Sequence, residues 1–398
     1  MTSRRSPVFR PLVFLMSVSF LRPQCPVNVT KVYGRRVLTH LAGPYVIGVD
    51  AGGTKTRAAV LTLGGALAGS GTGPGANPNS GGDTAGALTT ALSAALGDLD
   101  RSLVQGGVFG IAGAGSAGRP AAVAAARRAW HAVGLSGSPS VVTDIAVAFA
   151  AGTSASEGIV VFSGTGAGAA VISDGAIVQR ADGYGWLVGD QGSAVWLGRQ
   201  AVEATLAALD GRGAPTLLAE SVPRALLGPL ASTLMADGAP RGARVRRPPA
   251  PALAMVSAGA AAPGTATTTL DPPKRSPSAD LALAQAIIKE VYGRPPAALG
   301  RLGPVVCAAA AAGDPVARSI TDQAAQWLLR DVDAVRPALT DQNSPVVMAG
   351  SVLGHGPVAD AVRDGLRERF STDPRMAGDG AIGAAEMALR RLGLRPSN

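Results

Sequence analysis

Two glycine-threonine loops, each of which follows a short apolar run, have the composition to bind phosphate groups. The first reads Asp50-Ala51-Gly52-Gly53-Thr54-Lys55-Thr56, and the second reads Ser163-Gly164-Thr165-Gly166-Ala167-Gly168. Glycines let the backbone approach a phosphate closely, and each threonine offers both an N–H and a hydroxyl. One such loop is also an ordinary hairpin turn. Two of them, about 110 residues apart, favour a nucleotide phosphate chain held from both sides.

Two carboxylates follow predicted strands and could serve a phosphoryl transfer. Asp50 ends the run YVIGVD and could hold a hydrated magnesium ion, while Lys55 could face the phosphates. Asp144 ends VVTD and could be the general base that takes the proton of an attacking hydroxyl. It could equally be the N-cap of the following helix, because aspartate suits that position. The position alone does not separate these two interpretations.

The segment 182–193, DGYGWLVGDQGS, places two aromatic residues among glycines and aspartates. Aromatic faces beside a carboxylate are a frequent combination in sugar binding. We therefore expect Tyr184 and Trp186 to pack on a sugar ring and Asp190 to accept its hydroxyl protons. A plain hairpin-to-helix turn would not need this composition.

A competing motif, Gly113-Ala114-Gly115-Ser116-Ala117-Gly118, matches the dinucleotide fingerprint G-x-G-x-x-G. With Asp144 after the next strand, it would suit an NAD-dependent oxidoreductase. That interpretation leaves both glycine-threonine loops and the segment 182–193 without a role. The P-loop motif G-x-x-x-x-G-K-[ST] does not occur, so a P-loop enzyme is not expected.

The elements that must position these residues alternate between strands and helices. Apolar runs rich in β-branched residues predict strands, and longer amphipathic stretches predict helices. Strands are expected near 45–50, 57–63, 107–110, 139–144, 158–163, 167–173 and 345–350. Helices are expected near 83–97, 119–133, 145–152, 193–209, 281–293, 299–312, 315–335, 356–370 and 379–393. Both halves open with a strand that ends in a glycine-threonine loop, which indicates a duplicated α/β architecture with a ligand cleft between the halves.

Charge and composition exclude several classes of protein. The net charge is +9, but residues 1–43 and 231–278 together carry +11, which leaves −2 elsewhere. We expect both segments to be disordered, so the basic charge does not indicate a nucleic-acid partner. Only two cysteines and three scattered histidines are present, and no apolar run is long enough for a membrane span. A cytoplasmic protein is expected, although residues 1–43 resemble a signal peptide and equally suit a mis-assigned start.

Taken together, the motifs resemble the BadF/BadG/BcrA/BcrD ATPase family and, within it, the N-acetylglucosamine and glucosamine kinases. The resemblance rests on DAGGTKT at 50–56, TDIAVAF at 143–149, SGTGAG at 163–168, GYGWLVGDQGS at 183–193, AAGDPVA at 311–317, AGSVL at 349–353 and DGAIGAA at 379–385. It implies a duplicated actin-like (ribonuclease H-like) sugar kinase fold with ATP and Mg²⁺ in a cleft between two domains. The expected domains are 44–150 and 151–393, the second with the insertion 231–278, followed by a tail at 394–398.

The resemblance also implies roles for individual residues. Asp144 would activate the 6-hydroxyl of an amino sugar, and Asp50 would hold the metal through water. Nucleotide contacts are implied for Asp50, Gly52, Gly53, Thr54, Lys55, Gly164, Thr165, Gly166, Gly350 and Ser351. Sugar contacts are implied for Asn77, Gly183, Tyr184, Gly185 and Asp190.

Three positions depart from the family pattern. Gln191 replaces a glutamate, Ala167 replaces a serine after Gly-Thr-Gly, and Tyr184 replaces the tryptophan of animal relatives. A second branch of the family uses cysteines to hold an iron–sulfur cluster, and Cys25 and Cys307 lie too far apart in the sequence to favour it. A non-catalytic sugar or nucleotide sensor of the same fold stays an alternative. The preferred sugar and the assembly, for which a homodimer is one candidate, stay open.

Overall fold

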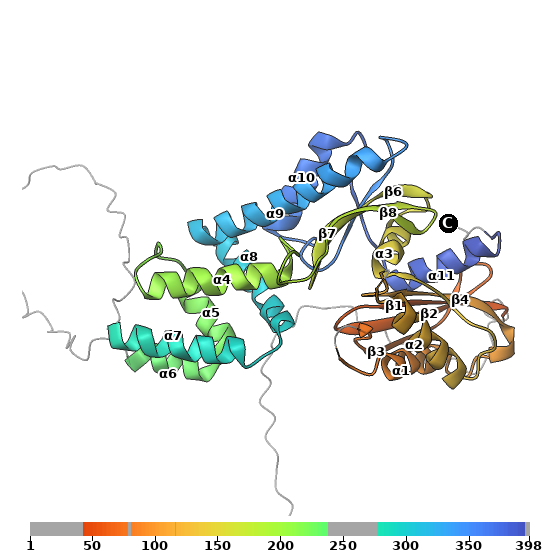
Figure 1. Cartoon of the computed structure of the whole chain (residues 1–398), viewed down its shortest axis with the longest axis horizontal. Helices are drawn as coiled ribbons and strands as arrows, with labels where there is room; N and C mark the ends of the chain where they lie inside the picture. The colour runs from red at the N-terminus through yellow and green to blue at the C-terminus, as the bar shows by residue number, and fades with distance from the viewer. Residues whose placement is uncertain (1–42, 79–80, 116, 238–276, 395–398) are drawn as a thin grey trace, which may run out of the picture. The chain divides into compact units, whose positions relative to one another are not determined.

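The computed structural model describes residues 43–78, 81–115, 117–237 and 277–394. The expected leader at 1–43 lies almost wholly outside these residues. Two five-stranded mixed sheets, with helices packed against them, organise the described chain (Figure 1).

The first sheet is built from the amino-terminal part of the chain. Its order is β3-β2-β1-β4-β5, in which β1, β2 and β3 are antiparallel and β4 and β5 run parallel to β1. The strands are β1 Tyr45–Ala51, β2 Lys55–Thr62, β3 Leu67–Pro74, β4 Val104–Ile111 and β5 Ser140–Thr143.

The second sheet repeats this pattern. Its order is β10-β9-β6-β7-β8, with an antiparallel meander of β6, β7 and β8 and with β9 and β10 parallel to β6. The strands are β6 Glu157–Ser163, β7 Ala167–Ser173, β8 Ala176–Asp182, β9 Val346–Ala349 and β10 Arg375–Met376. The matching connectivity of the two sheets confirms the predicted duplication.

Helices follow the strands in both halves, largely where the apolar periodicity predicts them. The α-helices are α1 Thr84–Leu96, α2 Arg119–Ala132, α3 Asp144–Gly152, α4 Ala194–Leu209, α5 Leu218–Leu227, α6 Pro229–Asp237, α7 Pro277–Tyr292, α8 Gly303–Ala311, α9 Pro315–Val335, α10 Pro357–Arg369 and α11 Gly380–Arg391. Short 3₁₀ helices cover η3 Arg101–Leu103, η4 Pro296–Leu302 and η5 Arg336–Ala338.

Strand β3, which the apolar pattern does not predict, is held by direct packing against helix α1. A Cβ atom on Gly69, Gly71 or Gly73 would collide with the backbone carbonyls of α1. The glycines therefore let the strand lie against the helix backbone, and they also remove the alternation of apolar side chains that would mark a strand.

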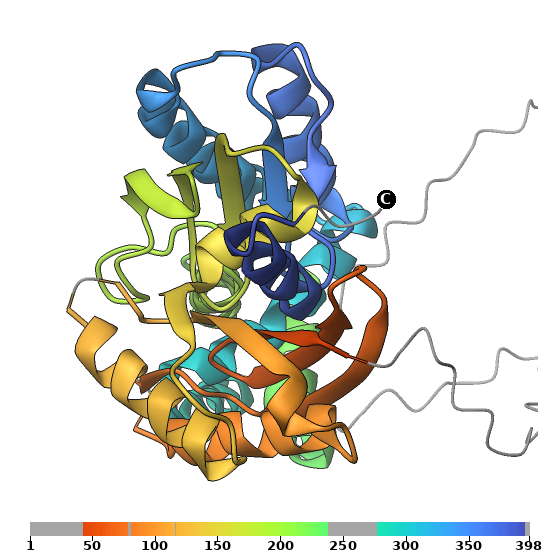
Figure 2. The same cartoon turned by 90° about the vertical axis from the view of Figure 1, so that its right-hand side faces the viewer.

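The last helix, α11, packs on the first sheet although it ends the described chain. Gly48 of β1 meets the backbone of Ala381 and Ala385, and Gly383 meets the backbone of Ala151 at the end of α3. Figure 2 shows α11 in dark blue beside the red strands of the first sheet. The C-terminal residues therefore complete the core of the amino-terminal half, which sequence periodicity does not indicate.

The expected insertion at 231–278 differs from the structure at both ends. Helix α6 extends through residues 231–237, and α7 begins at Pro277. Leu234 and Met235 pack against the core of the second half, so this stretch buries enough apolar surface to form a helix. Residues 238–276 lie outside the described part of the chain.

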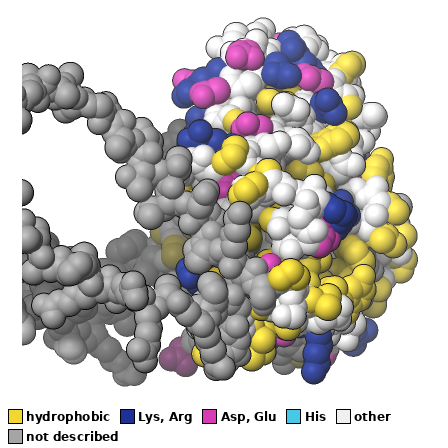
Figure 3. Space-filling view, turned by 90° about the vertical axis from the view of Figure 1, so that its left-hand side faces the viewer, with side chains coloured by type: hydrophobic (Ala, Val, Ile, Leu, Met, Phe, Trp, Pro, Cys, Tyr) yellow, Lys and Arg dark blue, Asp and Glu magenta, His cyan; other side chains and the backbone are white. Residues whose placement is uncertain are grey.

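Surface charge is mixed on one face of the described chain. On the face in Figure 3, basic and acidic side chains are interspersed over the described residues. None of the described helices is by itself both long and apolar enough to cross a membrane. Pro296–Ala311 and Pro315–Ala338 meet that test only jointly, across a bend of 118°.

Candidate active site

Asp50 and Asp144 leave the same edge of the first sheet. Asp50 pairs with Gly110 across the parallel strands β1 and β4, and Ile111 pairs with Thr143 across β4 and β5. Because parallel strands present their carboxyl ends at one edge, both carboxylates belong to the edge where α/β proteins bind ligands.

Asp144 is not the N-cap of α3, which was the alternative interpretation of its position. Thr143 is the cap, and its hydroxyl accepts the N–H of Ala146 at 3.3 Å. Asp144 occupies the first turn of the helix, where the backbone N–H groups of Ile145 and of Asp144 itself donate to its carboxylate. Burial, and next the charge of Asp50, raises the pKa of Asp144 from 3.8 to about 6. A carboxylate with this pKa is well suited to act as a general base near neutral pH.

Asp50 is set in a small network of charges. Burial raises its pKa, the nearby Arg57 guanidinium lowers it, and Asp379 raises it. Arg57 and Asp379 form a partly exposed ion pair at 3.9 Å. A Cβ atom on Gly380 would lie 2.5 Å from Oδ2 of Asp50, so only glycine at position 380 leaves room for this carboxylate against the start of α11.

The first glycine-threonine loop forms the tip of the β1–β2 hairpin. The N–H of Gly52 donates to the carbonyl of Lys55 at 2.9 Å, and Gly53, Thr54 and Lys55 are exposed. The segment that leads to Asn77 packs on this loop, since Ala76 donates its N–H to the carbonyl of Gly52 at 3.0 Å. The expected nucleotide residues 52–55 and the expected sugar residue Asn77 are therefore neighbours.

The second loop, between β6 and β7, is fixed from three sides. The buried hydroxyl of Ser163 donates to the carbonyl of Gly192 at 2.8 Å, and Ala194 donates its N–H to the carbonyl of Gly164 at 2.8 Å. The N–H of Val352 donates to the carbonyl of Ser163 at 3.0 Å. Thr165 stays exposed at the tip, where its hydroxyl can reach a ligand.

Gly350 and Ser351 lie against this second loop. Gly350 has a φ of 97°, and a Cβ atom there would overlap the carbonyl oxygen of Ser163. A residue with a side chain would meet both backbone strain and a clash at this position. The expected nucleotide residues Gly350 and Ser351 thus share one edge of the second sheet with the second loop, 164–166.

Asp190 points toward the second loop. It is 7% exposed, and its carboxylate accepts the N–H of Ala167 at 3.3 Å beside Gly166. Burial raises its pKa, and the hydrogen bond from Ala167 lowers it. The residue expected to bind sugar therefore also supports the phosphate loop.

The aromatic part of segment 182–193 is exposed. Tyr184 and Trp186 are 63% and 45% exposed, and Leu187 and Val188 are more exposed still. The Arg180 guanidinium lies 5.3 Å from the centre of the Tyr184 ring. Gly183 and Gly185, which flank the tyrosine, both have positive φ angles.

Three residues that the sequence did not mark as site residues hold parts of the candidate site in place. Asp182, with a φ of 57°, accepts the N–H groups of Asp190 at 2.8 Å and Gln191 at 2.9 Å. Asp379 is the N-cap of α11 and accepts the N–H of Ala381 at 2.8 Å. The Asp-Gly pair before an apolar helical run was the available signal for Asp379, while nothing local marks Arg57.

The contacts described here join the expected residues into two groups. Asp50 and Asp144 lie at the edge of the first sheet, next to the hairpin loop and Asn77. The second loop, Asp190 and Gly350 lie at the edge of the second sheet. That both glycine-threonine loops meet one phosphate chain stays a prediction.

Asp50, at the carboxyl edge of the first sheet, is a suitable ligand for magnesium. Within the described ranges, no three or more His, Cys, Asp or Glu side chains group to hold a metal ion. Magnesium usually keeps several waters and binds through one or two carboxylates plus substrate phosphates, so a caged site is not required. Asp50, a partly buried carboxylate at a strand end, fits such a water-mediated role.

Comparison with known proteins identifies the family. The model of the BadF/BadG/BcrA/BcrD ATPase family matches residues 47–388. The chain belongs to the BadF/BadG/BcrA/BcrD ATPase family. This finding confirms the resemblance drawn from the motifs.

Relatives of this ATPase family member include sugar kinases. It is 31% identical over 176 residues to an N-acetylmuramic acid/N-acetylglucosamine kinase of Clostridium acetobutylicum, a match that spans 44% of this chain and only 57% of that relative. A provisionally assigned N-acetylglucosamine kinase of Chromobacterium violaceum superposes with a TM-score of 0.56 and 25% identity, covering 87% of this chain and 98% of that structure. A second, from Porphyromonas gingivalis, has a TM-score of 0.58 at 18% identity, covering 87% and 99%. The fold is the expected actin-like sugar kinase fold.

Two competing interpretations, an NAD-dependent oxidoreductase and an iron–sulfur protein, are disfavoured by the structure. The segment 113–118 lies between β4 and α2, but the sheet opens with an antiparallel β1–β2–β3 meander and not with the parallel βαβ unit of a dinucleotide fold. Burial raises the pKa of the Cys307 thiol, which disfavours the thiolate that an iron–sulfur cluster needs. Cys25 lies outside the described residues.

Proposed function

We propose that this family member is an ATP-dependent sugar kinase that phosphorylates the 6-hydroxyl of an amino sugar, N-acetylglucosamine or glucosamine. The observation that carries the proposal is the pair Asp50 and Asp144 at the carboxyl edge of the first sheet. Asp144 has a pKa of about 6, and Thr143 is the N-cap of the helix that follows. The names of the Clostridium and Chromobacterium relatives support an amino sugar as the acceptor.

In the proposed reaction, Asp144 accepts the proton of the sugar 6-hydroxyl as that oxygen attacks. When bound, MgATP supplies the γ-phosphoryl group and a cation that offsets charge on the phosphates. Thr54 and Thr165 are both exposed, and in this proposal their N–H and hydroxyl groups donate to phosphate oxygens. Asn77, beside the first loop, and the exposed face of Tyr184 orient the sugar.

Asp190 has a second task in this proposal. Its buried carboxylate ties the sugar segment to the backbone of the phosphate loop at Ala167. A sugar hydroxyl that donates to the same carboxylate would therefore couple sugar binding to the geometry of the phosphate loop.

The test is ADP release by the full chain with MgATP and a panel of N-acetylglucosamine, glucosamine, N-acetylmuramic acid and glucose. We expect an amino sugar to give the highest kcat/KM. Asp144→Asn should lower kcat by about 10²- to 10⁴-fold, the usual contribution of a general base, and leave nucleotide binding intact. Asp360→Asn is a matched control, because Asp360 is the first-turn acidic residue of α10 and lies on the surface.

Near-normal turnover by Asp144→Asn would contradict the assignment of the base. Sugar binding without ADP formation by the wild-type chain would indicate a sensor instead of a kinase.

A further inference from the structure

Two buried side-chain oxygens have no hydrogen-bond partner among the described residues. They are Oε1 of Gln191, in the segment 182–193, and Oδ2 of Asp331 on α9. Buried polar atoms of native proteins are rarely left unpaired, so each of these oxygens calls for a physical explanation.

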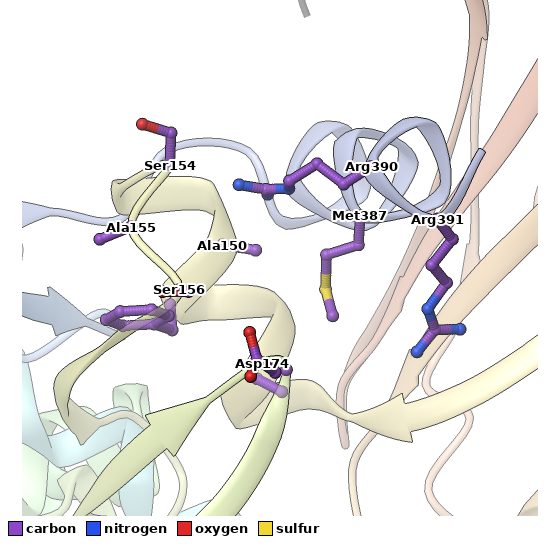
Figure 4. Close-up of a pocket in the computed structure, with 11 residues that line it drawn as sticks. Ala150, Ser154, Ala155, Ser156, Asp174, Met387, Arg390 and Arg391 are labelled. Atoms are coloured by element: carbon purple, nitrogen blue, oxygen red, sulfur yellow. The ribbon is translucent and has the colours of Figure 1, made fainter. Parts of the chain in front are cut away.

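Arg390 shows a contrasting case. Its Nη2 is buried and also lacks a hydrogen bond, but Oε2 of Glu386 lies 4.0 Å away and forms an ion pair with it. Arg390 borders a cavity of about 230 Å³ beside α3 and α11, to one side of Met387 (Figure 4). In the part of the chain that the structure describes, Asp331 has no basic partner of this kind.

The backbone at Gly192 lies against the face of α9 that carries Asp331. A Cβ atom on Gly192 would lie 2.7 Å from the carbonyl oxygen of Ala324 and 3.1 Å from Cγ of Leu328. Asp331 follows these two residues by seven and three positions, so it belongs to the same face of the helix. Gln191 directly precedes Gly192, which places it beside this face as well.

Asp182, at the end of β8, is a common neighbour of both unpaired groups. Its carboxylate accepts the N–H of Gln191 at 2.9 Å. Strand β8 packs against α9, and burial, and next the charge of Asp182, raises the pKa of Asp331 to about 7. Below that pH, Asp331 carries an O–H group that can donate, whereas Oε1 of Gln191 can only accept.

Within the described ranges, no basic group pairs with Asp331. Strand β8 presents Asp182 and, two residues earlier, Arg180, whose guanidinium lies over Tyr184, while β7 carries no charged side chain. Helix α10 packs on Leu329, on the opposite side of α9. Titratable and charged groups on the other elements around α9 are engaged or buried elsewhere: Arg199 with Glu203, Glu157 with Thr340, Arg336 with Gln342, Asp333 with Arg369, and the Cys307 thiol of α8.

We propose that the carboxylic acid of Asp331 donates a hydrogen bond to Oε1 of Gln191 and thereby fixes Asp190, the preceding residue, for sugar binding. Asp331 is then a positioning residue, because it acts through the segment 182–193. The role in sugar binding rests on the proposed function, whereas the hydrogen bond does not. Glutamine at position 191, where the family has glutamate, suits this pairing because its neutral oxygen accepts the proton without another negative charge beside Asp182.

A double-mutant cycle in urea unfolding tests the hydrogen bond without any use of kinase activity. The variants are Asp331→Ala, Gln191→Ala and their combination, at about pH 5.5 and about pH 8.5. We expect a coupling of at least threefold in the unfolding equilibrium constant at the lower pH. At the higher pH, where Asp331 has lost its proton, we expect none. Asp331→Asn keeps a donor, so in that background Gln191→Ala should cost the same at both pH values.

Kinetics then test the positioning role, with MgATP and the sugar of highest kcat/KM. At about pH 6.5, Asp331→Ala should raise the KM for the sugar at least fivefold with a smaller change in kcat, and Asp331→Asn should retain the wild-type KM. Between about pH 6.5 and about pH 8.5, the wild-type sugar KM should rise and that of Asp331→Asn should stay constant. At saturating sugar, kcat/KM for ATP should not fall over this range.

Two further variants complete the set. Gln323→Ala, on α9 with its amide bonded to Ser319, is the matched control and should not couple to Asp331→Ala. Asp331→Leu, which has a similar volume and no polar side-chain atom, takes the place of Asp331→Ala if that variant does not fold.

Additive effects of Asp331→Ala and Gln191→Ala at about pH 5.5 would overturn the hydrogen bond. Equal coupling at both pH values would overturn Asp331 as its donor, and a wild-type sugar KM in Asp331→Ala would overturn the positioning role. If the chain phosphorylates no sugar, the kinase proposal fails, while the unfolding cycle still decides whether the hydrogen bond exists.

Discussion

Asp144 and Asp50 lie together at the carboxyl edge of the first sheet, where burial, and next the charge of Asp50, raises the pKa of Asp144 to about 6. The two residues belong to motifs that lie far apart in the sequence, and the parallel pairing of β1, β4 and β5 brings their strand ends together. This relationship gives the proposed base a pKa close to working pH.

The first prediction concerns the pH dependence of turnover. Asp144 must be ionised to accept a proton, and its pKa is about 6, so kcat/KM should fall as pH drops through about 6 and level off above it. Asp50→Asn removes a like charge, which lowers the pKa of Asp144 and should move this acidic limb to lower pH. The measurement is kcat/KM against pH for both proteins.

The test depends on the pH at which kcat/KM falls, and not on the absolute value of kcat/KM. Asp50→Asn is also expected to reduce activity through loss of its metal contact. An acidic limb at the same pH in both proteins would show that Asp50 does not act on the base.

Much of the fold could be predicted from the sequence because its core strands carry continuous apolar runs. Strands β1, β4, β6, β7 and β9 have almost entirely buried carboxyl-terminal parts, and the apolar pattern shows them directly. Strand β3 was missed because glycines replace the side chains that would mark it, and β8 because it is largely exposed. Helix α11 packs on β1 although the two are far apart in the sequence, and no local pattern predicts such a contact.

Some features of the candidate site could likewise be predicted from local sequence, and others could not. Glycine-threonine loops and strand-end aspartates are local features, so their residues could be named in advance. The direction of a side chain depends on distant partners, as with Asp190, which meets the second loop. Asp314, in the motif AAGDPVA, has a structural role: it caps α9 and accepts the N–H of Leu217 at 2.6 Å.

Asp182 should hold the sugar segment in place. Its carboxylate accepts two backbone N–H groups, so Asp182→Ala leaves both without that partner, at about 1–3 kcal/mol for each one that stays buried. We expect the KM for the sugar to rise at least tenfold, with a smaller change in the KM for ATP. Asp210→Ala, at an exposed ion pair with Arg212, is the control. Unchanged sugar KM in Asp182→Ala would remove this role.

Asp331 should make stability depend on pH. Burial, and next the charge of Asp182, raises its pKa from 3.8 to about 7, and its Oδ2 is buried without a hydrogen-bond partner among the described residues. The folded protein therefore holds the proton more tightly than the unfolded chain. This contribution to stability is complete below pH 3.8 and is lost as pH rises through 7.

Asp331→Asn removes the ionisation and keeps the shape. Allowing for the partial solvent access of Asp331, we expect about 1–2 kcal/mol of added stability at pH 8 and little change at pH 4. Thermal melts of both proteins from pH 4 to 8 measure this difference. Asp333→Asn, two residues along α9 at an exposed ion pair with Arg369, should not reproduce it. A wild-type melting temperature that follows the variant at every pH would contradict the prediction.

Gly350 should be required for nucleotide binding because it lets β9 end directly against the second loop. Gly350→Ala adds a Cβ atom that overlaps the carbonyl of Ser163 at a φ of 97°, so the loop that carries Thr165 must shift. We expect the KM for ATP to rise at least tenfold, with a stability cost of about 1–3 kcal/mol from backbone strain. Gly354→Ala is the matched control four residues on, where the nearest atom outside the immediate neighbours, the Ser351 carbonyl oxygen, is 3.6 Å from the new Cβ. Because Asp190 ties the sugar segment to this loop, the KM for the sugar should rise as well. A KM for ATP no higher in Gly350→Ala than in Gly354→Ala would contradict this role of Gly350.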